Sequence, residues 1–290
     1  MSTGLAVVLI VALVATIATV PHYFGVKLPE PDSTVVFSLE DSPQAALWNA
    51  AVVVALVIAY TYVALAIVGR GRLFELVMAT VWFLGAMAAA WFYALLYYYA
   101  GLLHPAAALA ALFAAPIVTI PVAFTVLKSG NSPLFGALGA LLGAMVAQLF
   151  PRTTVLTVLA ALAVYDFASV KWGPLNKLIE RAVECHCPCE AARSCGRGAQ
   201  ALLPGLLVRL GKRAIGVGDF FAYGMAATFI AVGAAKLGVV TSLAMLAAAL
   251  AAIYVGIRTT LKWVEAEGAA PALPIPLAML APLLIVVWTV

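Results

Sequence analysis

The sequence predicts an all-α integral membrane protein, a single membrane domain over residues 1–290 with nine transmembrane helices. Composition is the first indication, because 66% of the 290 residues are hydrophobic and only 10% are charged, whereas soluble domains are nearer half apolar and a quarter charged. The second is that the apolar residues form nine segments, most of them close to the roughly 20 residues that cross a bilayer as a helix. The third is that the basic residues lie between these segments.

The predicted helices follow one another with short polar connections, and one longer loop, 171–213, contains every cysteine. Six helices precede this loop (1–170) and three follow it (214–290). The first segment lacks a basic start and a small-residue cleavage site, which favours a retained helix over the alternative, a signal peptide. Only Pro151-Arg152 separates the fifth segment from the sixth. The segments are about 4–20, 45–69, 74–100, 105–127, 133–150, 153–170, 214–235, 238–257 and 269–290.

The distribution of Lys and Arg predicts the orientation. If the N-terminus is cytoplasmic, all but three of the 16 basic residues lie in cytoplasmic loops or at cytoplasmic helix ends. The positive-inside rule then places the N-terminus and the 171–213 loop in the cytoplasm and the C-terminus outside. Because topology explains the basic residues, the net charge of +4 indicates no nucleic-acid partner. The three outer basic residues are Lys27, Arg152 and Lys236.

Ten of the 12 acidic residues lie in loops or at helix ends, including Glu75 at the start of the third segment, which leaves two within apolar segments, Asp166 in the sixth and Asp219 in the seventh. An ionisable side chain in a membrane segment is costly and indicates function. Asp166 is five residues from Lys171 and Asp219 is seven residues from Lys212, which is roughly 8 and 10 Å of helical rise. We therefore expect both acids at a similar depth. Two carboxyl groups placed in this way can share a proton and hold a water, as in aspartic proteases.

Two other classes of membrane hydrolase are excluded by the residues that are missing. No histidine lies in a predicted apolar segment. A metalloprotease with an H-E-x-x-H helix is therefore excluded, and so is a Ser–His hydrolase, because its base is absent.

Glycines and prolines mark the backbone near the acids. Gly216 and Gly218 are costly in a helix, but they remove side chains beside Asp219 and let another backbone approach. Prolines cannot all donate to a regular helix, so the last segment is expected to begin extended, as a peptide-binding wall would. Its prolines are Pro271, Pro274 and Pro276. Small residues in the fifth segment favour helix packing over a ligand site: Gly136, Gly139, Ala140 and Gly143.

Three motifs resemble those of presenilin and the wider family of G-x-G-D intramembrane aspartyl proteases, which includes signal peptide peptidase. Tyr165-Asp166 is similar to the Y-D motif, Gly216-Val217-Gly218-Asp219-Phe220 to the G-x-G-D-F motif, and Pro271-Ala272-Leu273-Pro274 to the P-A-L motif. A lone G-x-G-D also occurs in prepilin peptidases, whereas three motifs in this order form a specific signal. The resemblance covers the order of nine helices and is strongest from about Leu162 to Leu277.

The resemblance implies a presenilin-like fold with Asp166 and Asp219 as the catalytic pair on the sixth and seventh helices. It implies hydrolysis of peptide bonds within transmembrane segments of single-span proteins in the lipid bilayer, with no cofactor required for catalysis. It also implies that seven further residues shape the active site or substrate groove: Tyr165, Gly216, Val217, Gly218, Pro271, Ala272 and Leu273.

Details of the resemblance point to the compact members of the family. Gly173-Pro174-Leu175 and Tyr223 are more similar to presenilin than to signal peptide peptidase. The 171–213 loop is much shorter than in animal presenilins, so neither self-cleavage nor an obligate accessory subunit is implied. In these features the chain resembles the compact single-chain members of archaea more than the animal presenilins.

A different function remains as an alternative. Paired aspartates also serve proton- or cation-coupled transporters, and proline-broken helices form ion sites in them. No internal repeat relates the two halves of this chain, which argues against a transporter. An inactive scaffold with the same fold is a further alternative.

The cysteines of the 171–213 loop form a cluster with His186: Cys185, Cys187, Cys189 and Cys195. Four thiols and an imidazole could hold a structural zinc ion, although the spacing is not a familiar zinc pattern. A disulfide, rare in the cytoplasm outside hyperthermophiles, and reduced thiols are the alternatives. Because the cluster is separate in sequence from both acids, we expect any metal there to be structural.

Overall fold

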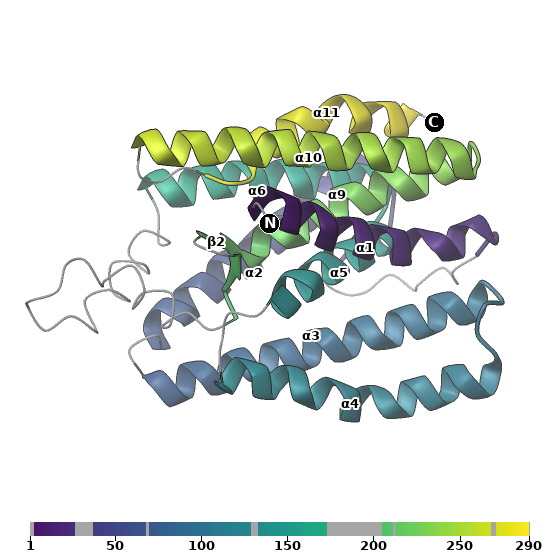
Figure 1. The fold of residues 1–290 in the computed structure, drawn as a ribbon, viewed down its shortest axis with the longest axis horizontal. Coiled ribbons are helices and arrows are strands. Elements are labelled where there is room, and N and C mark those ends of the chain that lie inside the picture. Colours follow the sequence, from purple (N-terminus) through teal and green to yellow (C-terminus); the bar gives the residue numbers. More distant parts are fainter. Residues whose placement is uncertain are drawn as a thin grey trace, which may run out of the picture.

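The computed structural model describes residues 3–26, 37–67, 70–128, 133–172, 205–210, 213–267 and 271–289. Within these ranges the chain forms nine helices and one small antiparallel hairpin. The helices run roughly along one direction as a single bundle, and the hairpin lies toward one end of it (Figure 1). The prediction of a nearly all-helical architecture is therefore confirmed.

Six helices form the first part of the chain, and each coincides with a predicted apolar segment. The separation of the fifth from the sixth is confirmed, since the Pro151 carbonyl accepts the Val155 N–H at 3.0 Å and so opens the sixth. The first helix continues further than predicted and includes His22. The six are α1 (Thr3–Tyr23), α2 (Pro43–Ile67), α3 (Gly71–Tyr99), α4 (Pro105–Lys128), α5 (Pro133–Leu149) and α6 (Arg152–Trp172).

The seventh apolar segment does not begin as a helix. Strand β1 (Leu207–Leu210) pairs antiparallel with strand β2 (Arg213–Gly216). Helix α9 (Val217–Ala235) follows β2 directly, so the predicted start at residue 214 was wrong by three residues. Hydropathy does not distinguish a buried strand from a buried helix, because both are continuous apolar runs.

The last two helices differ from their predicted ends in opposite ways. Helix α10 (Val239–Glu267) extends ten residues past the predicted end at 257, so Arg258 and Lys262 lie on the helix and not in a loop. Hydropathy ends at the first charged turn, whereas backbone hydrogen bonds continue beyond it. Helix α11 (Pro274–Thr289) begins later than the predicted start at 269.

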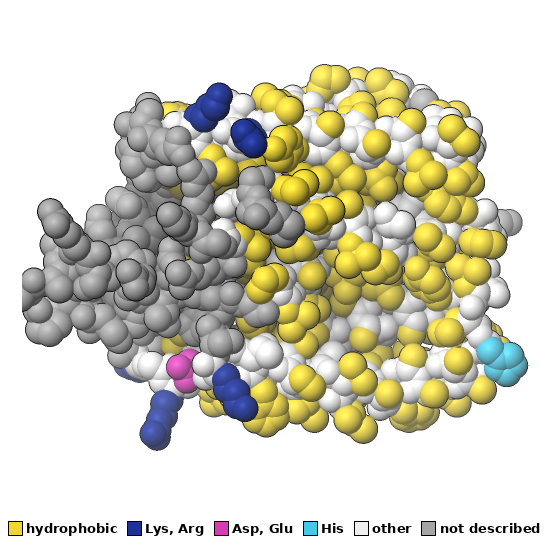
Figure 2. All heavy atoms as spheres, viewed as in Figure 1, with side chains coloured by type: hydrophobic (Ala, Val, Ile, Leu, Met, Phe, Trp, Pro, Cys, Tyr) yellow, Lys and Arg dark blue, Asp and Glu magenta, His cyan; other side chains and the backbone are white. Residues whose placement is uncertain are grey.

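Seven of the helices that the structure describes are long and apolar enough to cross a membrane. The other two, α5 and α11, have 17 and 16 residues and are apolar but shorter, about 25 Å at 1.5 Å per residue. Large apolar side chains are exposed on the outer helices; on α4, Phe113 is 75% exposed. On the face shown in Figure 2, apolar side chains cover most of the bundle, and the visible Lys and Arg side chains gather at one end. Such a surface suits a bilayer.

Helix α9 lies at the centre of the bundle. Its apolar span is 78% buried, compared with 17% for α2 and 22% for α4. Helices α5, α10 and α1 pack against it, and α11 packs on α10, α6 and α9. Helices α3 and α4 form a pair at one side of the bundle (Figure 1), and α2 packs on α6.

Glycines allow α5 and α9 to pack with their backbones in contact. A Cβ atom added at Gly143 would overlap the Phe221 carbonyl oxygen, and one at Gly224 would overlap the Ala140 carbonyl oxygen. A Cβ atom at Gly139 would lie 2.7 Å from Cγ1 of Val217. The small residues of the fifth segment are therefore packing residues, as predicted, and they fix the position at which α9 begins.

Candidate active site

The hairpin and the start of α9 place Asp219. Leu207 pairs with Gly216 at the end of the hairpin, and the Val217 N–H donates to the Leu206 carbonyl at 3.0 Å. The chain turns from strand to helix at this point, and Asp219 is the third residue of α9. A short strand thus carries the chain to the acid in extended form, and the acid lies in the first turn of the central helix.

Asp219 is held by the helix that carries it. Its carboxyl group is 7% exposed, and Oδ2 accepts the Gly216 N–H at 3.2 Å. Only this half of a capping box can form, since glycine has no side chain to return the bond. The free N–H groups at the start of α9 favour a negative charge at this position.

Asp166 is held by a different helix from its own. It lies on α6 and is half-buried, and its Oδ2 accepts the Leu273 N–H at 2.9 Å. The Ala272 amide also acts on this carboxyl group. Because the Leu273 carbonyl accepts the Leu277 N–H at 3.1 Å, Leu273 is the residue that opens α11. Asp166 therefore caps the N-terminus of α11 from outside.

The structure brings the two acids together. Asp166 and Asp219 are close enough to interact electrostatically. Each accepts the N–H that precedes the first turn of a helix, α9 for Asp219 and α11 for Asp166. Two positive helix ends thus converge on two like-charged groups, which reduces the cost of placing them together.

The route by which Asp219 reaches this depth differs from the prediction. Equal depth was inferred from helical rise over all residues from Lys212 to Asp219, but residues 213–216 are a strand. A strand rises about 3.3 Å per residue, roughly twice the helical rise, so the depth estimate for Asp219 was wrong. The meeting of the acids depends instead on how α6, α9 and α11 pack.

The P-A-L segment is short. Pro271, Ala272 and Leu273 precede α11, and Pro274 and Pro276 lie in its first turn. The expected extended start therefore does not include Pro274 and Pro276, because first-turn N–H groups have no intrahelical partner and proline loses nothing there. The first turn of α11, directly after the segment, is seated on α10, where a Cβ atom at Gly256 would lie 2.5 Å from the Pro276 Cα.

Tyr223 connects the two sides of the site. It lies one turn after Asp219 on α9 and is 1% exposed. Its hydroxyl donates to the Ala272 carbonyl at 2.9 Å, and it interacts electrostatically with both carboxyl groups. From the sequence, Tyr223 was noted only through the family resemblance, because a tyrosine in an apolar helix carries no positional signal of its own.

The glycines beside Asp219 have different surroundings. A Cβ atom at Gly216 would lie 3.3 Å from Asp219 Oδ2, whereas one at Gly218 would have no atom within 4 Å. Gly218 is exposed, so the open space next to the acid is at Gly218. Val217, predicted as a site residue, is buried against Gly139 of α5 and has a packing role.

Tyr165 is adjacent to Asp166 in sequence, but its hydroxyl is engaged elsewhere. It lies 3.2 Å from Oγ1 of Thr61 on α2, and that Thr61 hydroxyl donates to the Val57 carbonyl. In this structure Tyr165 joins α6 to α2, and its predicted place in the substrate groove remains a prediction.

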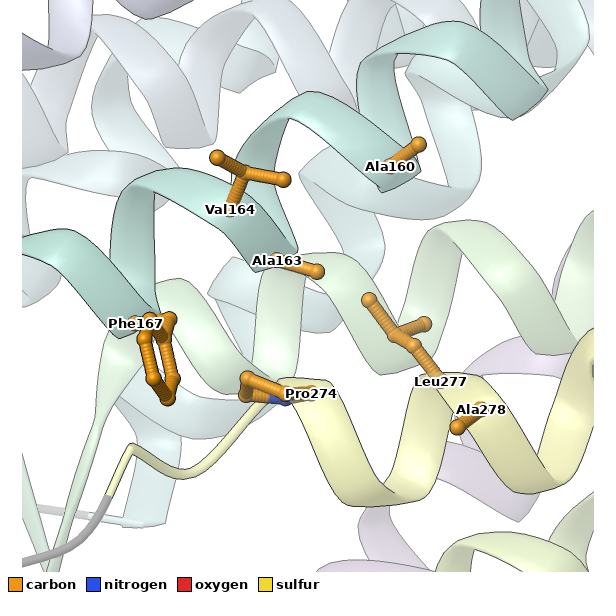
Figure 3. A pocket seen from close by; sticks show the side chains of 7 residues that line it. All are labelled: Ala160, Ala163, Val164, Phe167, Pro274, Leu277 and Ala278. Carbon is orange, nitrogen blue, oxygen red and sulfur yellow. The ribbon is translucent and has the colours of Figure 1, made fainter.

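An open apolar groove of about 410 Å³ lies between α6 and α11 (Figure 3). Ala163 and Phe167 flank Asp166 in sequence, and Pro274 follows Leu273 directly, so the groove runs alongside the residues that hold the Asp166 carboxyl group. Sequence reasoning did not find it, because it depends on the spacing of two helices far apart in the chain. Its lining is Ala160, Ala163, Val164 and Phe167 from α6 and Pro274, Leu277 and Ala278 from α11.

A second feature that the sequence did not reveal is the anchor of the hairpin. The Trp82 indole N–H on α3 donates to the Gly205 carbonyl at 3.0 Å, and the Trp82 ring packs against Phe135 of α5. Gly205 has φ +77°, and a Cβ atom there would lie 2.6 Å from the indole nitrogen. Hence only glycine suits this position, which fixes where β1 begins.

Metal binding by Cys185, Cys187, Cys189 and Cys195 remains a prediction, since these residues lie outside the described ranges. Among the residues that the structure does describe, no three His, Cys, Asp or Glu side chains form a group that could hold a metal ion. The acid pair on its own offers two carboxyl groups.

No family model matches this chain, and no curated protein matches it. The chemistry proposed for it therefore depends on the arrangement of its own residues.

Proposed function

We propose that this protein is a presenilin-like intramembrane aspartyl protease that hydrolyses peptide bonds within transmembrane segments of single-span membrane proteins. The observation that carries the proposal is the pairing of Asp166 with Asp219 inside an apolar bundle. In an apolar bundle such a pair is costly. Here the backbone of two helix starts supports it.

The mechanism follows from two neighbouring carboxyl groups in different protonation states. The ionised carboxylate takes a proton from a water, whose oxygen attacks the scissile carbonyl carbon. The protonated partner donates its proton to the carbonyl oxygen, giving a tetrahedral diol. As the C–N bond breaks, the carboxyl group that took the water proton donates it to the nitrogen, and the other carboxylate takes one of the two diol protons. A carboxylic acid and an amine are released, and the carboxyl pair is left with one proton as at the start.

Access for a substrate is supported on two sides of the pair. Gly218 leaves open space beside Asp219, where a peptide backbone can come close. The groove between α6 and α11 is apolar and opens on the surface of the bundle beside Asp166. A transmembrane segment could approach through it without leaving hydrocarbon.

The test is cleavage of a generic transmembrane peptide by the purified full-length protein in detergent or liposomes. We expect Asp166→Asn and Asp219→Asn each to lose at least about 1,000-fold in rate, because acid and base roles each contribute roughly 100- to 10,000-fold. An inhibitor that mimics the tetrahedral diol should stop the wild-type reaction.

Matched controls lie on the same two helices. The Thr157 hydroxyl on α6 bonds only to its own helix at the Thr153 carbonyl, as far as the described contacts show, and the buried Thr228 hydroxyl on α9 has no partner among the described residues. Thr157→Val and Thr228→Val should therefore cleave at the wild-type rate. If both Asn variants cleave as well as these controls, the assignment is wrong. If the wild type cleaves no peptide but carries an ion flux that the Asn variants lose, the result would favour the transporter.

A further inference from the structure

Three residues before α11 bring their backbone to Asp166, and the described contacts hold them from two directions. One is the hydrogen bond from the Leu273 N–H to Asp166 Oδ2. The other is the hydrogen bond from the Tyr223 hydroxyl to the Ala272 carbonyl, at 2.9 Å. These two bonds use the C=O and the N–H of one peptide unit, the one between Ala272 and Leu273, and they lead to different helices, α6 and α9. Together they fix both the position and the rotation of the segment.

The hydrogen bond from Tyr223 to the Ala272 carbonyl is formed by a buried hydroxyl group. Tyr223 is 1% exposed, and a buried hydroxyl or carbonyl without a hydrogen-bond partner is destabilising. Pro271 cannot donate a backbone N–H, so this segment has few other ways to be anchored. Its polar groups can be satisfied at membrane depth only by protein.

The hydroxyl also belongs to the surroundings of the acid pair, because Tyr223 interacts electrostatically with Asp166 and with Asp219. Tyr223 lies on the same helix as Asp219, four residues later. The helix that carries one acid therefore also holds the segment that caps the other acid, Asp166. A shift of the segment along α11 would break its contact with Tyr223 and move the Leu273 amide away from Asp166.

We propose that Tyr223 is a positioning residue whose hydroxyl holds the Pro271–Leu273 backbone so that the Leu273 amide stays on Asp166. Its role in cleavage rests on the function proposed above, whereas the tether itself can be tested without activity. Tyr223 acts through the backbone of the segment and takes no part in bond making.

The kinetic test compares Tyr223→Phe with the wild type in the full-length protein. The substitution keeps the ring but leaves the Ala272 carbonyl without its Tyr223 partner, so the melting temperature should fall by a few degrees at most. We expect kcat to fall about ten-fold with KM unchanged, the size expected from one lost hydrogen bond in a geometry-sensitive step. Tyr93→Phe is the matched control, since the buried Tyr93 hydroxyl on α3 donates to the Leu141 carbonyl on α5 at 3.2 Å. It should leave both constants within two-fold.

The second test measures the segment directly. In a background with the four native cysteines replaced by Ser, Ala272→Cys is labelled with a membrane-permeable maleimide, with and without Tyr223→Phe. We expect labelling to become several-fold faster when the hydroxyl is absent. Ala278→Cys is the control, because Ala278 is exposed on α11 beyond the segment, and its labelling rate should not depend on Tyr223.

The outcomes separate the two ideas. Equal labelling of Ala272→Cys with and without the hydroxyl overturns the tether. Faster labelling with a kcat within two-fold of the wild type overturns the positioning role in cleavage. If the wild type cleaves no peptide, the proposed function fails, and faster labelling of Ala272→Cys alone still supports the tether.

Discussion

The two carboxyl groups are carried by interfaces of opposite character. Asp219 lies on α9, which packs on α5 so closely that Gly143 and Gly224 have no room for a methyl group. Asp166 lies on α6, which is separated from α11 by an open groove of about 410 Å³. The first interface has its backbones in contact, and the second leaves unfilled apolar space.

This difference suggests a division of roles within the pair. The acid on the tight side is enclosed and is held by its own helix at Gly216. Asp166, the acid on the open side, is held by the start of α11 beside the groove. We expect substrates to approach the Asp166 side while the α5–α9 interface keeps the other half of the site fixed, which agrees with the precision that catalysis needs.

The largest effect is expected from a substitution that forces the tight α5–α9 interface apart. We expect Gly143→Val to destabilise the protein by about 3 kcal/mol or more, since the added atoms would overlap the Phe221 carbonyl and overpacking costs roughly 1–3 kcal/mol even at milder sites. Unfolding in detergent measures the loss. Gly71→Val is the control, because a Cβ atom at Gly71 would meet nothing within 4 Å. Equal stability of the two variants would contradict the packing role.

A smaller effect is expected from the P-A-L segment. Pro271→Ala should lower cleavage on the order of 100-fold while the melting temperature changes little, because a backbone displacement of about 1 Å suffices for such a loss. Pro282→Ala, a proline inside α11, should leave cleavage unchanged. An unaltered rate for Pro271→Ala would mean that the motif merely begins a helix, and a collapsed melting temperature would assign it to folding.

A substitution that fills the groove between α6 and α11 tests whether substrates approach on the open side of the site. Ala163→Leu places three more carbons into the space between α6 and α11. We expect KM to rise about ten-fold with little change in kcat or stability, since a hydrophobic pocket discriminates by roughly 1–3 kcal/mol per methylene group. The same change at the exposed Ala110 of α4 should have no effect. A normal KM for Ala163→Leu would show that substrates do not use this groove.

The smallest effect should come from the cysteines. Replacing Cys185, Cys187, Cys189 and Cys195 by Ser should leave cleavage largely intact, because the cluster is separate in sequence from both acids. Cleavage and bound zinc are measured on the same preparation. Loss of cleavage in this variant, together with dependence of the wild type on zinc, would instead tie the loop to activity.

Much of this molecule could be predicted from hydropathy and from the proline and charged residues that separate the apolar segments. Apolar length located the nine helices, and Pro151-Arg152 divided α5 from α6. The two acids were found because charge is rare in apolar segments. The elements missed are those set by tertiary contacts: the last three residues of β2 continue directly into the apolar run of α9, and only the Gly211-Lys212 pair between two apolar runs hinted at a hairpin turn.

Details of the site were predictable to different degrees for the same reason. Gly216 and Gly218 were expected to act alike, yet only Gly218 faces open space. Three prolines suggested an extended start that included Pro274 and Pro276, but both lie in the first turn of α11, where a helix tolerates proline. The bond from Tyr223 to Ala272 joins residues 49 apart in sequence, and no local pattern encodes such a distance.

The central position of α9 has a consequence for how the chain assembles as it is synthesised. Helices α1 and α5 both pack on α9, which begins only at Val217. Until that helix is made, the glycine face of α5 and the inner face of α1 lack their α9 partner. They must be shielded by lipid or by one another. Assembly of this bundle therefore waits for the last quarter of the chain, and Asp166 gains its cap only after the residues that open α11 have been made.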